Sequence, residues 1–211
     1  MPDFPIIFSA PMIQALLRGD KTMTRRLAWR ERKTTQPNQY KMSPTPWQRV
    51  RPADRIWVRE SLKAAPLPNI LTGEPTNAIC AYYAADNEDC VNPHGFNLAW
   101  LWERPHLPSI HMPRPFSRLT LIVTATKIER LQDISEEDAK SEGIEYRDNC
   151  YGTWNSDGTM RCGGANNARE AFRCLWININ GNGTWETNPE VVAVSSRVIK
   201  ANIDAPEAKA A

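Results

Sequence analysis

Four side chains that could take part in acid–base or anion chemistry lie close together near the N-terminus: Lys21, Thr24, Arg25 and Arg26. Three cations within six residues repel one another, so the segment is either a solvated basic loop or a loop that faces an anion or nucleotide. In the second case Lys21 is a candidate base, because neighbouring cations lower the pKa of an ammonium group. Both interpretations stay open at this point.

A short predicted helix precedes this segment and fixes where it begins. Ser9 is a candidate N-cap, and Gly19 supplies the left-handed residue that commonly ends a helix. If residues 21–24 continued as a regular strand, the side chains of Lys21 and Thr24 would point to opposite faces. A site that uses both residues therefore requires a turn near Lys21.

Length and composition indicate a soluble globular protein. The 211 residues are 41% hydrophobic and 24% charged, and a formal charge of +2 is too small to argue for nucleic acid by itself. No apolar run approaches the roughly 20 residues of a membrane span, and the N-terminus lacks a signal-peptide pattern. We therefore expect a cytoplasmic protein without a membrane partner.

The cysteines and histidines do not predict a metal or cofactor site. The five cysteines form no CxxC pair, so neither a zinc knuckle nor a disulfide framework is indicated. His106 and His111 lie among prolines, where structural or surface roles are the ordinary account. We expect no metal and no cofactor.

Charge is unevenly distributed along the chain. Residues 1–33 hold seven Lys/Arg against three acids, whereas residues 127–148 hold eight acids against four bases. These two segments either meet around one cleft or form two separate solvated faces, and the second arrangement is the default expectation.

Hydrophobic periodicity predicts several short strands and about three helices. Strands are predicted at residues 4–8, 55–60, 78–84, 117–130 and 191–199. Helices are predicted at residues 10–18, 136–142 and 168–179, and residues 146–164 are predicted to form a loop. Residues 97–103, with Trp100 and Trp102, are either a short helix lining a site or a packed hydrophobic plug.

Proline marks two predicted loop insertions. Twelve of the 17 prolines lie between Pro37 and Pro115, where they would interrupt helices and central strands. We therefore expect a single domain over residues 1–203, with insertions at about 27–50 and 63–114 and a flexible tail at 204–211. Short strands, few helices and no repeating βαβ pattern favour an α+β fold built on a small twisted β-barrel.

Several segments in the same order resemble the ASCH domain, a relative of the PUA-like RNA-binding barrels. Residues 19–26 (GDKTMTRR) resemble its G-x-K-x-x-T-x-R signature, and residues 54–60 (DRIWVRE) resemble its "G-D-x-L-x-V-x-E" strand, with Ala53 where glycine is usual. Residues 117–121, 131–135 and 172–189 are similar to the longer ASCH proteins of phages and prophages. The resemblance implies a PUA-like barrel.

The resemblance also implies an activity. Some small bacterial ASCH proteins are amidohydrolases that remove the acetyl group from N(4)-acetylcytidine, with a lysine as base, a threonine as nucleophile and a glutamate as proton donor. By position in the motifs these roles fall on Lys21, Thr24 and Glu142. Four further residues are implied in substrate binding: Arg25, Arg26, Arg55 and Glu60. Arg25 departs from the small enzymes, which have an aliphatic residue at that place.

Two other functions remain open. In the first the protein is a binding module for single-stranded RNA or a modified nucleoside, with Arg25, Arg26, Arg30, Arg55 and Arg59 at phosphate and exposed aromatic residues stacked on bases. In the second it is a phage protein that binds a host protein through its Trp-rich loops, since tryptophan is enriched at interface anchors. The oligomeric state is not predicted.

Overall fold

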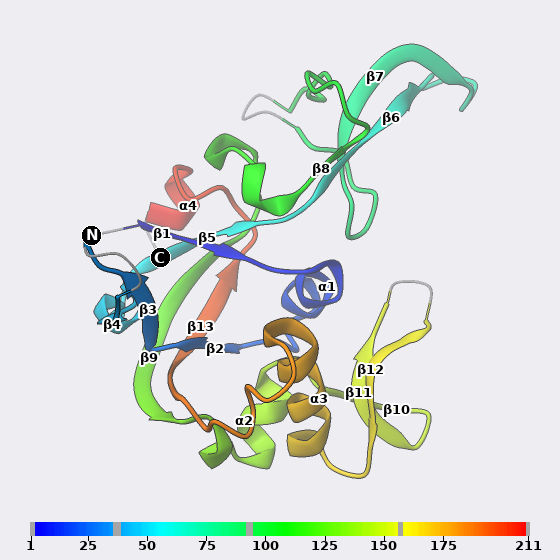
Figure 1. Cartoon of the computed structure of the whole chain (residues 1–211). Coiled ribbons are helices and arrows are strands. Elements are labelled where there is room, and N and C mark those ends of the chain that lie inside the picture. The colour runs from blue at the N-terminus through cyan, green and yellow to red at the C-terminus, as the bar shows by residue number, and fades with distance from the viewer. Residues whose placement is uncertain (1–2, 36–38, 92–94, 156–157, 210–211) are drawn as a thin grey trace. The chain divides into compact units, whose positions relative to one another are not determined.

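The computed structural model describes residues 3–35, 39–91, 95–155 and 158–209. The chain divides into two compact units, each assembled from segments that are distant in the sequence. Unit 1 comprises Met1–Leu17, Arg55–Leu121 and Val198–Ala211; unit 2 comprises Arg18–Asp54 and Ile122–Arg197. Figure 1 gives the labels of the helices and strands used below.

Unit 1 contains most of the N-terminal strand–helix pair and the second predicted insertion. Its elements are β1 (Asp3–Ile7), α1 (Ala10–Arg18, whose last residue belongs to unit 2), β5 (Arg55–Arg59), β6 (Leu62–Pro68), β7 (Pro75–Tyr83), β8 (His106–Leu107), the 3₁₀ turns η2 (Ser109–His111) and η3 (Arg114–Phe116), and α4 (Pro206–Lys209). β1 and β5 pair in parallel, while β6 pairs antiparallel with both β7 and β8. The predicted alternation of β5 is confirmed, because Ile56 and Val58 are fully buried and Trp57 between them is not.

A cluster of buried side chains from β6, β7 and the following loop forms a core in unit 1. Leu62, Tyr83, Cys90 and Met112 are among its members, and Leu98, Trp100, Trp102 and Phe116 pack against it. The rings of Trp100 and Trp102 lie 4.9 Å apart, edge to face. The helix alternative for residues 97–103 is wrong, since the segment has no helical turn, and the hydrophobic-plug alternative is confirmed.

Unit 2 contains the basic segment and the acidic segment. Its elements are β2 (Met23–Leu27), β3 (Trp29–Lys33), β4 (Tyr40–Pro44), η1 (Pro46–Arg49), β9 (Thr120–Arg130, whose first two residues belong to unit 1), η4 (Leu131–Asp133), α2 (Glu136–Ser141), β10 (Glu145–Arg147), β11 (Cys150–Trp154), β12 (Met160–Ala165), α3 (Ala168–Asn180) and β13 (Glu190–Ile199, whose last two residues belong to unit 1). β13 lies between β9 and β2, and it pairs antiparallel with β2.

The segment predicted as a loop at residues 146–164 forms most of a three-stranded antiparallel sheet, β10–β11–β12, against which α3 packs (Figure 1). The loop prediction is wrong because Gly152 and Gly163 lie within paired strands. A Cβ atom on Gly163 would lie 2.4 Å from the Cα of Gly152, so these glycines allow two strands to approach closely. Gly163 also has a φ of +126°, which favours glycine.

Both predicted helices of unit 2 are confirmed, and side chains cap them as expected. The Ser135 side chain accepts a hydrogen bond from the backbone N–H of Asp138 at the start of α2. At the start of α3, Asn167 accepts from the N–H of Glu170. The Glu136 carboxylate accepts from the N–H groups of Ala168 and Arg169, so α2 supplies a second cap for α3.

The mixed α+β class is confirmed, but no closed barrel is found within the described residues, and the PUA-like barrel stays a prediction. Both predicted insertions contain regular strands: the first contains the β3–β4 hairpin, and the second contains β6, β7 and β8. Of these, only β7 was predicted, as the strand at residues 78–84, and that prediction is confirmed. The short helix α4 lies in the segment predicted as a flexible tail. Among the described residues, no helix combines the length and the apolar composition needed to cross a bilayer.

Candidate active site

Lys21 lies in the short connection between α1 and β2, outside the regular strand, which begins at Met23. Gly19 ends α1 with a φ of +86°, a conformation that favours glycine. The backbone of Thr22 is then held from two sides. Its N–H donates to the carbonyl of Ser141 at 2.9 Å, and its carbonyl accepts from the N–H of Ser196 at 2.8 Å. These contacts fix Lys21 beside the end of α2.

The Lys21 ammonium group is buried and directed at three oxygen atoms. Its Nζ donates to the carbonyl of Met23 at 2.8 Å, to the carbonyl of Glu142 at 2.7 Å and to Oε2 of Glu142 at 2.8 Å. Glu142 is the C-cap of α2, so its carbonyl lies at the negative end of the helix, where a cation is stabilised. Both side chains are about 3–5% exposed, which makes this an ion pair shielded from solvent.

Arg25 forms the second half of the same cluster. Its side chain is 0% exposed, and its guanidinium donates to Glu129, Asp138 and Glu142. The closest contacts are 2.6 Å to Asp138 and 2.7 Å to Glu129, and a fifth hydrogen bond goes to the sulfur of Met23. All five N–H groups of the guanidinium are thus directed at protein acceptors. This arrangement suits a residue that positions Glu142, and the substrate contact predicted for Arg25 remains a prediction.

Burial dominates the electrostatics of the cluster. It lowers the pKa of Lys21, and the neighbouring Arg26 and Arg25 lower it further, while the Glu142 carboxylate opposes the change. Burial likewise lowers the pKa of Arg26, again opposed by Glu142. For Asp138 burial raises the pKa, but hydrogen bonds from Lys127 and Arg25 outweigh it and hold the pKa below its usual range. Lys21 therefore loses its proton more readily than an exposed lysine.

Thr24 and Arg26 both belong to β2. Thr24 pairs with Val194 of β13, and its side chain is 4% exposed. Alternation along the strand puts Thr24 and Arg26 on one face and Arg25 on the other. The Arg26 guanidinium lies over the ring of Trp47, 5.9 Å from its centroid.

The basic and acidic segments meet within unit 2, contrary to the default expectation of two separate faces. Arg25 contacts Glu129 and Asp138, and Arg18 contacts Glu145. Glu129 and Asp138 were not singled out from the sequence. The signal that could have found them is the excess of acids at residues 127–148 opposite an excess of cations at residues 1–33.

Arg55 and Glu60, which the resemblance placed in the substrate site, belong to unit 1 and have ion-pair partners there. Arg55 contacts Asp3 at 2.8 Å and donates to the carbonyl of Ile203. Glu60 is 1% exposed and receives two hydrogen bonds from Arg118, at 3.0 and 2.9 Å. Burial raises the pKa of Glu60, and Arg118 opposes the change. Their substrate-binding roles remain predictions.

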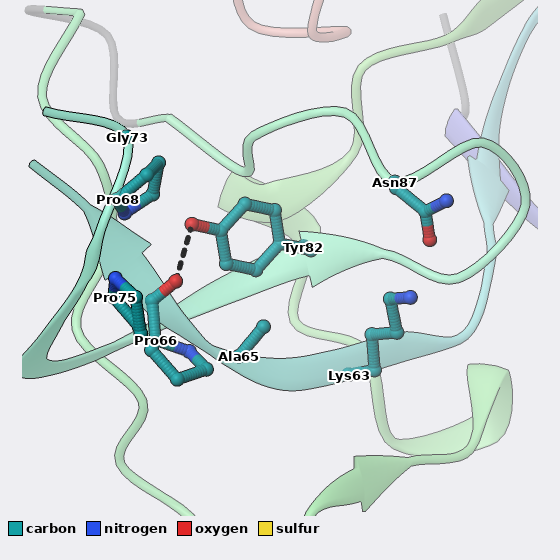
Figure 2. Close-up of a pocket in the computed structure, with 8 residues that line it drawn as sticks. All are labelled: Lys63, Ala65, Pro66, Pro68, Gly73, Pro75, Tyr82 and Asn87. Carbon is teal, nitrogen blue, oxygen red and sulfur yellow. Dashed lines mark hydrogen bonds between the residues drawn. The ribbon is translucent and has the colours of Figure 1, made fainter. Parts of the chain in front are cut away.

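Unit 1 also contains a hollow of about 330 Å³ on the β6–β7 hairpin. Figure 2 shows Pro66, Pro68 and Pro75 at one end, Lys63 and Asn87 at the other, and the Tyr82 ring between them. The Tyr82 hydroxyl donates to the carbonyl of Pro66 at 3.3 Å, which holds the ring against the prolines. The Lys21–Glu142 cluster belongs to unit 2.

The described part of the chain contains no group of three or more His, Cys, Asp and Glu side chains suited to a metal ion. Comparisons with protein-family models, with curated proteins and with solved structures found no match. One backbone feature bears on the resemblance: Ala53, which stands where the ASCH motif has glycine, has a φ of +72°. That conformation favours glycine over alanine.

Proposed function

We propose that the protein hydrolyses the amide bond of N(4)-acylated cytosine nucleosides, with Lys21, Thr24 and Glu142 as the catalytic residues. The observation that carries the proposal is the 2.8 Å contact between Lys21 and Glu142, which are 121 residues apart in the sequence and both buried. The substrate class comes from the resemblance of the Lys21–Thr24 segment to the ASCH signature. The left-handed backbone at Ala53 supports that resemblance.

Lys21 and Glu142 share one proton, and the reaction requires that proton on Glu142. As an ion pair the proton is on Lys21; in the neutral pair it is on Glu142, which leaves Lys21 as a base and Glu142 as an acid. Burial lowers the pKa of Lys21, which favours release of the proton from its ammonium group. In this proposal the neutral pair is the reactive form.

In this form the reaction proceeds in two steps. The Thr24 hydroxyl attacks the acyl carbon while Lys21 accepts its proton, and Glu142 gives its proton to the exocyclic nitrogen as the C–N bond breaks. Cytidine leaves, and the acyl group remains on Thr24 as an ester. Water then hydrolyses the ester, releasing a carboxylic acid and restoring the threonine.

The main competing account is an ion pair that only ties the α1–β2 connection to α2. The two accounts differ in what Lys21 must do: a structural pair needs a cation, whereas catalysis needs a group that can lose its proton. Arginine keeps the charge but stays protonated at all relevant pH values. Lys21→Arg therefore keeps the positive charge that a structural ion pair needs and removes the base that catalysis needs.

The test is cytidine release from N(4)-acetylcytidine by the wild type, by Lys21→Arg and by Lys140→Arg. Lys140 is an exposed lysine of α2 and serves as the matched control. We expect turnover by the wild type and the control, and a loss of at least about 10²-fold in Lys21→Arg. A thermal melt of each variant checks that it folds. Equal turnover by all three proteins would remove Lys21 as the base, and a folded wild type without turnover would overturn the proposed activity.

A further inference from the structure

The β3–β4 hairpin is a two-stranded ribbon with different chemistry on its two faces. Arg30 pairs with Ser43 and Arg32 with Lys41, and directly paired residues share a face. One face therefore presents Arg30, Arg32 and Lys41. The alternate residues form the other face, where Trp29, Tyr40 and Met42 are 39%, 61% and 60% exposed.

Positive charge is concentrated on and beside this ribbon. Residues 29–51 hold six Lys/Arg and one acid, a net charge of +5. The whole chain has a net charge of only +2, so the remainder carries −3. Within the described residues, no carboxylate forms an ion pair with Arg30, Arg32, Lys41 or Arg49. Such a field attracts a polyanion.

The base of the ribbon is fixed to unit 2 by hydrogen bonds. The Thr45 N–H donates to the carbonyl of Ala28 at 2.9 Å, and its hydroxyl donates to the carbonyl of Leu27 at 2.7 Å. The Gln48 amide also donates to the Ala28 carbonyl, and the Trp29 indole donates to Glu190 at 2.8 Å. The cations and the Trp29 ring are therefore presented by an anchored element, and little ordering entropy opposes binding there.

A hollow of about 300 Å³ lies on the cationic face, between the ribbon and η1. Arg32 and Ser43 line it from the ribbon, whose strands β3 and β4 are labelled in Figure 1, and Arg49 lines it from η1. Two guanidinium groups and a hydroxyl around one concave site match a phosphate group, because arginine donates paired hydrogen bonds to phosphate oxygens.

We propose that the β3–β4 ribbon binds the phosphodiester backbone of a single-stranded nucleic acid, with one phosphate in the hollow between Arg32 and Arg49. A ribbon of two strands is only about 5 Å wide between strand axes, so a flexible single strand that crosses its edge reaches both faces. Phosphates then meet the cationic face, while unpaired bases stack on Trp29 and Tyr40. A duplex offers no free base faces to these rings. This site does not depend on the proposed hydrolase activity.

The test uses fluorescence anisotropy of the full chain with a labelled 12-nucleotide RNA of mixed sequence, and with DNA of the same sequence. The variant Arg32→Ala/Arg49→Ala removes the proposed phosphate site. Arg161→Ala/Arg197→Ala removes the same charge from exposed positions of unit 2 and is the matched control. We expect affinity to fall about tenfold or more in the first variant and to change little in the control. The plot of log K against log salt should become shallower by about 0.7, because the variant loses one phosphate contact.

A second pair of variants tests the aromatic face. Tyr40→Ala should weaken binding by about 5-fold to 100-fold, whereas Tyr40→Phe should keep wild-type affinity, because stacking needs the ring and not the hydroxyl. The proposal is supported if single-stranded RNA or DNA binds the wild type and the variants lose affinity as stated. The strand that binds more tightly identifies the nucleic acid for which the site is suited. Tighter binding of the matched duplex, equal competition by polyglutamate, or no binding at low salt would each overturn it.

Discussion

At the scale of single residues, unit 2 buries two cations beside carboxylates that satisfy them. Lys21 has three oxygen acceptors within 2.8 Å, and Arg25 uses all five of its N–H groups. Burying charged groups costs free energy that even a well-made ion pair only partly offsets. Stability alone therefore does not explain the buried Lys21–Glu142 pair, and we propose that the pair serves catalysis.

The shared proton predicts that kcat/KM with N(4)-acetylcytidine falls at high pH. Activity falls at high pH because the pair loses the proton that Glu142 must donate. Burial lowers the pKa of Lys21, so this loss begins below the usual range of lysine. In Glu142→Gln the high-pH limb should disappear, and the weak remaining activity should rise with pH as Lys21 becomes neutral. The measurement is initial rates of cytidine release, corrected for spontaneous hydrolysis. A wild-type rate that still climbs through pH 10 would contradict the shared proton.

Residues of the Lys21–Glu142 cluster were predictable from the sequence only where they belong to a recognisable motif. Lys21 and Thr24 stand in a recognisable basic signature, and Glu142 follows from the same resemblance. Glu129 and Asp138 carry no such mark, because their role depends on the tertiary contact with Arg25. The burial of Arg25 was also not predictable, since adjacent arginines ordinarily indicate a solvated segment.

At the scale of secondary structure, α2 is followed directly by Glu142, the proposed proton donor, and also caps the next helix. Its C-cap is Glu142, and its first residue, Glu136, accepts hydrogen bonds at the start of α3. α3 in turn places Phe172 near Arg25, with the guanidinium 5.9 Å from the ring centroid. The start of α3 is thus linked to the geometry around Arg25.

Removing either cap of α3 should destabilise the protein. Asn167→Ala removes the acceptor for the N–H of Glu170 and should lower the free energy of unfolding by about 1 kcal/mol. Glu136→Ala leaves the N–H groups of Ala168 and Arg169 without a carboxylate and should cost a similar amount. Glu137→Ala is the control, because that carboxylate is 81% exposed and its pair with Lys140 contributes little. Urea denaturation measures all three, and equal stability of the Asn167 and Glu137 variants would contradict the role of the cap.

Helices and strands with an amphipathic pattern or a capping residue were predictable from the sequence. Strands that lack such a pattern and are recognised only by their pairing were not. Four elements have a clear hydrophobic period or a clear N-cap residue in the sequence, and each lies close to its predicted position: α2, α3, β9 and β13. The β10–β12 sheet was missed because its pairing depends on Gly152 and Gly163, whose lack of side chains permits close backbone approach. The β3–β4 hairpin was not predicted because both strands are largely exposed and β3 shows no alternation of apolar and polar residues.

At the scale of the whole molecule, the distribution of charge matters more than its total. The chain has a net charge of +2, yet residues 29–51 carry +5. The remaining cations of the N-terminal segment are partly neutralised by acids within unit 2, as Arg25 and Arg18 show. Composition alone therefore did not indicate nucleic acid, although one hairpin of the molecule has the charge and the aromatic residues to bind it.

The proposal that Thr24 is the nucleophile is tested by measuring cytidine release after removal of the Thr24 hydroxyl alone. Thr24→Val keeps the shape and the strand propensity of the buried residue but has no nucleophile, whereas Thr24→Ser keeps a hydroxyl. Cytidine release from N(4)-acetylcytidine should fall at least about 10³-fold in Thr24→Val and stay measurable in Thr24→Ser, with both variants folded by thermal melt. Wild-type turnover by a folded Thr24→Val protein would contradict the proposed mechanism.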